Sequence, residues 1–159
     1  MAAIESLNDL DWTNSMYDSW RQVEKTITFD GGTANAIGDH DGTGDPFDIF
    51  TVTGTVRAKV FAICTTNLAG ASATLEVGTA GTTAGIIAQT TATDIDAGEI
   101  WHDASPDAQV EAASVATENI IANGADIVGT CGTANITAGV IKFICLWKPV
   151  STDGNVTAA

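Results

Sequence analysis

The sequence predicts an all-β fold, either an antiparallel β-sandwich or a related jelly-roll or β-tulip domain. Three observations lead to this class. From residue 25 onward, short segments rich in β-branched residues alternate apolar and polar positions. Gly, Asn, Asp or Pro separate most of these segments, as tight turns require. No long helical pattern alternates with them, which disfavours a parallel α/β fold.

The first expected strand runs over residues 25–29 and ends at the turn Asp30-Gly31-Gly32. In the longest early segment, residues 55–65, small apolar side chains alternate with larger or charged ones. One helix is expected at 104–116, because Pro106 lies where a first helical turn favours proline. The other expected strands are 47–53, 73–77, 85–89, 99–102, 119–122, 126–130 and 136–148.

Three parts of the chain are expected: an N-terminal arm at 1–24, a β-sandwich domain at 25–150 and a flexible C-terminal tail at 151–159. Apolar residues in the arm recur every three or four positions, which indicates one or two helical turns. Its aromatic residues are candidate interface anchors, namely Trp12, Tyr17 and Trp20. The arm either covers one end of the sandwich as a short helix or docks on a neighbouring subunit.

Charge narrows the classes of partner. Six Lys plus Arg stand against twenty Asp plus Glu, which gives a formal net charge of -14. The closest basic pair is Arg57 and Lys59, so no basic patch is expected, and neither nucleic acid nor an anionic membrane surface is an expected partner. No apolar run approaches the roughly 20 residues of a membrane span, and no secretory signal is recognisable, so synthesis in the cytoplasm is expected.

Residue types that could support catalysis are sparse. The chain has two histidines, and no nucleophile elbow, phosphate-binding loop or dinucleotide fingerprint occurs, so a non-enzymatic protein is expected. Two acidic stretches, 94–99 and 101–103, contain carboxylates and a possible sugar-stacking Trp101, but acidic loops are expected throughout so negative a chain. The three cysteines fit no disulfide or zinc pattern and are expected to be buried free thiols.

One loop has a partial ion-binding pattern. Asp39, Asp41 and Asp45 alternate with His40 and glycines, as oxygen ligands do in the first half of an EF-hand calcium loop. The match then fails, because Phe50 stands where the loop needs its closing bidentate carboxylate. Calcium binding therefore competes with a second interpretation, a solvated acidic turn that Gly and Asp favour on their own.

The run 134–147, together with 50–56 and the Ala-, Thr- and Gly-rich middle of the chain, resembles small structural proteins of tailed bacteriophages. Within that group the chain is most similar to capsid decoration, or cement, proteins. The resemblance covers most of residues 25–150 and lies in composition and in short sequence segments. It implies a virion component on the capsid surface that self-associates, as a homotrimer, and contacts the major capsid protein without catalysis.

An alternative within the same group is a tail or fibre component that binds a host receptor or glycan. Its recognition surface would be the loop 39–45 together with Trp101. A calcium-dependent surface domain of a bacterium is a further alternative, and an enzyme such as a virion-associated depolymerase comes last.

Overall fold

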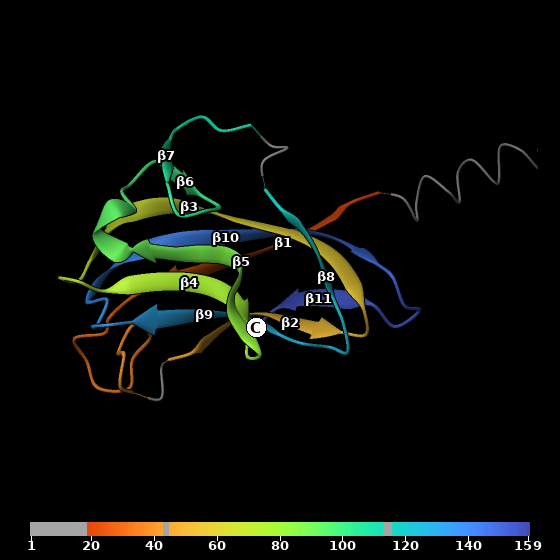
Figure 1. Cartoon of the computed structure of the whole chain (residues 1–159), viewed down its shortest axis with the longest axis horizontal. Helices are drawn as coiled ribbons and strands as arrows, with labels where there is room; N and C mark the ends of the chain where they lie inside the picture. Colours follow the sequence, from red (N-terminus) through yellow and green to blue (C-terminus); the bar gives the residue numbers. More distant parts are fainter. Residues whose placement is uncertain (1–18, 43–44, 113–115) are drawn as a thin grey trace, which may run out of the picture.

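Two antiparallel sheets stack face to face in the computed structural model, which describes residues 19–42, 45–112 and 116–159 (Figure 1). The first sheet has the order β1-β10-β3-β6-β7, and β8 also pairs with β3. The second sheet has the order β11-β2-β9-β4-β5. The all-β sandwich expected from the sequence is thus confirmed.

The strands of the first sheet are β1 (Arg21–Thr28), β3 (Val56–Ala69), β6 (Glu99–Trp101), β7 (Asp107–Ala108), β8 (Glu118–Ile121) and β10 (Ala138–Pro149). Those of the second are β2 (Phe47–Thr53), β4 (Thr74–Thr79), β5 (Thr82–Thr91), β9 (Ile127–Gly132) and β11 (Asn155–Ala158). A single-turn 3-10 helix, η1 (Ala92–Asp94), follows β5. No helix in the described ranges has the length and apolarity needed to cross a bilayer.

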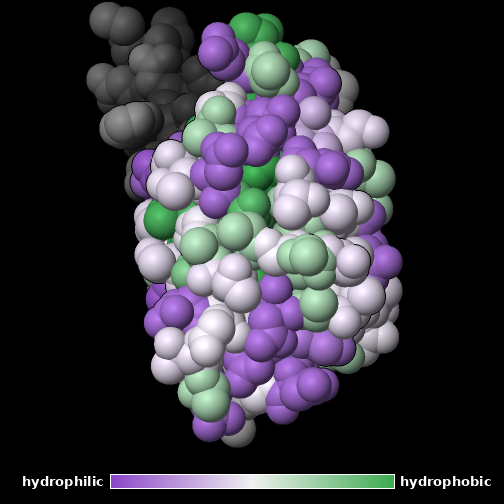
Figure 2. All heavy atoms as spheres, turned by 90° about the vertical axis from the view of Figure 1, so that its left-hand side faces the viewer, coloured by the Kyte–Doolittle hydropathy of each residue, from purple (hydrophilic) through white to green (hydrophobic). Residues whose placement is uncertain are grey.

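The core lies between the sheets and follows the period-two pattern of their strands. Along β3 the side chains of Val56, Ala58, Val60 and Ala62 are buried, whereas the residues between them point away from the core. On the neighbouring β10, Phe143 pairs with Ala62 and fills the same layer. At the end of the sandwich that carries η1, hydrophilic residues are interspersed with residues of intermediate hydropathy and a few apolar ones (Figure 2).

The strand boundaries differ from expectation at the N-terminus. β1 begins at Arg21, not at Lys25, so Arg21–Glu24 belong to the first sheet and not to the arm. The reason is long-range pairing: Arg21 lies opposite Trp147 and Val23 opposite Cys145 on β10. Val23, which completes the helical spacing of apolar residues in the sequence, lies in this strand and not in a helix.

The expectation of a flexible tail at 151–159 is wrong. A turn at Ser151–Gly154 returns the chain, and β11 pairs with β2 with Val156 opposite Val52. Val156 is 4% exposed, so this strand buries an apolar side chain and also covers the edge of β2.

The helix expected at 104–116 is also absent from the part of that segment that the structure describes. Asp107 and Ala108 form β7, whose backbone pairs with Ile100 and Glu99 of β6. Gln109 then takes a positive φ of 65°, a conformation that ends regular structure for a non-glycine residue. Sheet pairing therefore outweighs the weak helix-start signal of Pro106.

Candidate functional site

The face of the first sheet that points away from the core, called here the outer face, carries both apolar and charged side chains. Because directly paired residues share one face of a sheet, the pairing places Lys142, Ile63, Ile100 and Asp107 in one row across β10, β3, β6 and β7. Ile63 is 37% exposed. The outer face also carries the half-buried Phe61 and Leu146, and Ile120, which pairs with Arg57, is 72% exposed. Exposure of these apolar side chains to water costs free energy.

Basic residues gather on this same face. Lys148 pairs with Arg57, and Lys59 lies on the same side of β3 as Arg57. With Lys142, the outer face holds four of the six Lys and Arg residues of the chain. The expectation that no basic patch exists is therefore wrong. The cause is the register of β10 on β3, which brings together residues about ninety positions apart.

Trp20 marks the point where the N-terminal arm reaches this basic cluster of Arg57, Lys59 and Lys148. Its ring lies 4.9 Å from the Nζ of Lys148, 5.5 Å from that of Lys59 and 6.0 Å from the Cζ of Arg57. These are cation–π distances. The other two expected anchors, Trp12 and Tyr17, lie outside the described residues.

Carboxylates at the border of the outer face offset part of its positive charge. Glu24 pairs with Lys142, and Glu118 pairs with Arg57. Each ion pair holds the pKa of its carboxyl group below the ordinary glutamate value, because a neighbouring cation favours the charged form. The face therefore has a basic cluster at one end of β3 and β10, with ion pairs at its border.

The loop at 39–45 does not form the expected ligand cluster. Asp39 accepts hydrogen bonds from the backbone of Asn35 at 2.7 Å and the amide of Asn135 at 3.2 Å. Asp45 accepts one from the backbone of Cys131 at 2.7 Å. Asp41 is 97% exposed, and among the described residues the three carboxylates form no group close enough to share an ion. Asp45 fastens the loop to β9, and Asp39 fastens it to Asn135 just beyond that strand.

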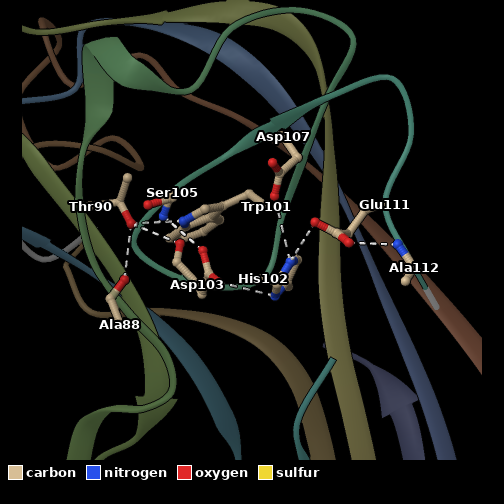
Figure 3. Close-up of polar contacts among 9 residues, drawn as sticks. All are labelled: Ala88, Thr90, Trp101, His102, Asp103, Ser105, Asp107, Glu111 and Ala112. Atoms are coloured by element: carbon tan, nitrogen blue, oxygen red, sulfur yellow. Dashed lines mark hydrogen bonds and ion pairs between the residues drawn. The ribbon is translucent and has the colours of Figure 1, made fainter. Parts of the chain in front are cut away.

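A second cluster lies at the β7 edge of the first sheet, and of its residues only those in the stretch 101–103 stand out in the sequence. His102 follows β6, Asp107 lies in β7 and Glu111 follows it, and Figure 3 shows both carboxylates turned toward the imidazole. Nε2 of His102 is 3.4 Å from Oε2 of Glu111 and 3.8 Å from Oδ2 of Asp107. Nδ1 is 3.8 Å from Oδ2 of Asp103 on the other side.

The two carboxyl groups of this cluster perturb each other. A hydrogen bond with Glu111, then burial, raises the pKa of Asp107 above its ordinary value. The same contact, together with the backbone N–H of Ala112 and the neighbouring imidazole of His102, lowers the pKa of Glu111. The contact thus favours a proton on Asp107 over one on Glu111, because two neighbouring bare carboxylates repel.

Trp101 offers no surface for a sugar. It is 0% exposed, its ring meets Phe143 edge-on at 6.3 Å, and its indole N–H donates to the hydroxyl of Thr90 at 2.9 Å. The expectation that Trp101 contributes to a recognition surface is therefore wrong. It is a core residue that ties β6 to β5.

The cysteines behave as expected. Cys64, Cys131 and Cys145 are free and buried. Burial raises the pKa of Cys131 and of Cys145 to about 12, so both stay protonated thiols at neutral pH. They serve as core residues, not as nucleophiles.

No protein-family model, curated protein or solved structure gives a significant match to this chain.

Proposed function

We propose that the protein is a non-enzymatic virion structural component that decorates and stabilises a bacteriophage capsid through protein–protein contacts. Its partners are further copies of itself, in a homotrimer, and the major capsid protein. The observation that carries the proposal is the outer face of the first sheet, where the exposed Ile63 and Ile120 share the face with a basic cluster in a chain of net charge -14. Such a face suits assembly more than solvent.

The occupant of this face is the N-terminal arm of a neighbouring copy. Residues 1–18 contain four carboxylates and no Lys or Arg, and they also carry the apolar Leu7 and Leu10 and the aromatic Trp12. An acidic, apolar segment complements a basic, apolar face in both charge and hydrophobicity. Trp20, at the end of the arm, already lies against the basic cluster of its own chain, so the arm leaves the domain at this face.

Charge reversal tests the pairing of arm and face. Lys59→Glu should weaken self-association by about tenfold or more, because it places a carboxylate opposite acidic partners. Reversing the arm with Asp9→Lys and Asp11→Lys should weaken it similarly, and combining the two sets should restore it. Sedimentation velocity of the full chain over a concentration series gives the association constant. The matched control is Arg21→Glu, the same charge change on the face of the first sheet opposite the outer face, where Arg21 lies beside Trp147.

Two results would refute this arrangement: a full chain that stays monomeric at high concentration, or a combined variant that assembles no better than either parent. The capsid role has a separate assay. Capsids that carry the protein should release DNA at a higher temperature than capsids that lack it, and equal release temperatures would count against decoration even if the chain self-associates.

A further inference from the structure

His102 has a buried, unsatisfied nitrogen aimed at two carboxylates. Its side chain is 6% exposed, and Nε2 has no hydrogen-bond partner despite being shielded from water. A buried polar atom without a partner destabilises the folded state. The atom therefore calls for a partner, and the nearest groups, Glu111 and Asp107, are at 3.4 and 3.8 Å, too far or too poorly aligned to bond directly.

The spacing of these three groups suits a metal ion placed between them. Nε2 of His102 and one oxygen each of Asp107 and Glu111 all lie within 4.8 Å of one another. Two ligands that each bind a tetrahedral zinc at about 2.1 Å are about 3.4 Å apart. The measured 3.4 Å between Nε2 and Oε2 of Glu111 equals that edge, and the 3.8 Å to Asp107 needs only a small adjustment.

We propose that His102, Asp107 and Glu111 form a binding site for a divalent transition-metal ion, with zinc as the best fit. The imidazole nitrogen favours zinc over calcium and magnesium, which prefer oxygen ligands alone. Three protein ligands leave a fourth position for water or for a group from a partner subunit. The cation also separates the two carboxylates, which otherwise repel each other.

The surroundings fit a metal site on both sides of the ligands. Asp103 stands 3.8 Å from Nδ1 of His102, on the side where a metal-bound histidine commonly meets an orienting carboxylate. Oε1 of Glu111 accepts the backbone N–H of Ala112 at 2.6 Å, which leaves Oε2 for the ion. Asp107 is 46% exposed, so an ion reaches the site from solvent without unfolding.

Binding should hold the segment after β7 on the first sheet. Asp107 is in the strand and Glu111 lies beyond its end, so an ion shared with His102 closes the loop onto β6. Because Asp107 pairs with Ile100 in the row that contains Ile63, the site also lies beside the outer face. The ion thus fixes the border of that face, and this role does not depend on what binds there.

Isothermal titration calorimetry of the full chain with zinc chloride tests the site directly. We expect one zinc per chain, and Asp107→Asn and Glu111→Gln should each weaken its affinity by about tenfold or more, since each removes a charged ligand. Both side chains are partly exposed and nearly isosteric with their replacements, so these variants should fold. Replacing the buried His102 would risk misfolding. The matched control is Asp41→Asn, the same change beside His40, which should leave affinity unchanged.

Cobalt(II) provides the second measurement. The bound ion should show the visible bands of nitrogen and oxygen ligation without the intense near-ultraviolet band of thiolate ligation, because the three cysteines are buried elsewhere. Zinc affinity that is unchanged in both carboxamide variants overturns the proposal. So does a loss that is equal in Asp41→Asn, or a thiolate band with cobalt.

Discussion

Replacing Val156 by alanine should lower the free energy of unfolding by about 2 kcal/mol. The side chain is 4% exposed, and the pairing of Val156 with Val52 places it in the core. Losing two buried methyl groups at about 0.8 kcal/mol each, with an added cavity term, gives this magnitude. In a domain of this size the melting temperature should fall by about 4–8 °C.

Urea unfolding followed by tryptophan fluorescence measures the effect, and Thr157→Ala is the matched control. Thr157 is the next residue of the same strand but is exposed, so its truncation should change stability by about 0.5 kcal/mol or less. Equal and negligible effects of the two substitutions would refute the assignment of residues 155–158 to the core-covering edge of the second sheet.

Two further predictions concern buried polar contacts. Trp101→Phe should cost about 1–3 kcal/mol in thermal unfolding, because it opens a small cavity and removes the hydrogen bond to Thr90, and an unchanged melting temperature would contradict this packing. Burial raises the pKa of Asp45, so the wild-type chain loses stability as pH rises from the unfolded pKa through the higher folded one. Asp45→Asn keeps an acceptor for Cys131 and should gain stability relative to wild type over that pH range; a difference that does not vary with pH would argue against this.

The sequence was sufficient where local pattern determined structure. Along β3, the alternation of Val56, Ala58, Val60 and Ala62 with larger residues identifies both the strand and its buried face. The burial of the cysteines as free thiols was also predictable. Each of these features depends on neighbouring residues, so no knowledge of the fold is needed to find it.

The features that carry the two proposals depend on strand pairing within the first sheet. The basic cluster exists because Lys148 lies opposite Arg57, and no local signal reports that register. The His102 cluster exists because β7 folds back on β6, in a segment whose sequence suggested a helix. β11 was missed for a related reason, because its four residues form a strand only against the edge of β2.

The most direct test of the proposed function is a cryo-electron-microscopy map of intact particles. We expect regular copies of this sandwich over the head lattice, self-associated around symmetry axes, with residues 1–18 of one copy on the outer face of the next. Absence from the head would contradict the decoration role, and density for the chain only at the tail would indicate a receptor-binding or fibre component instead.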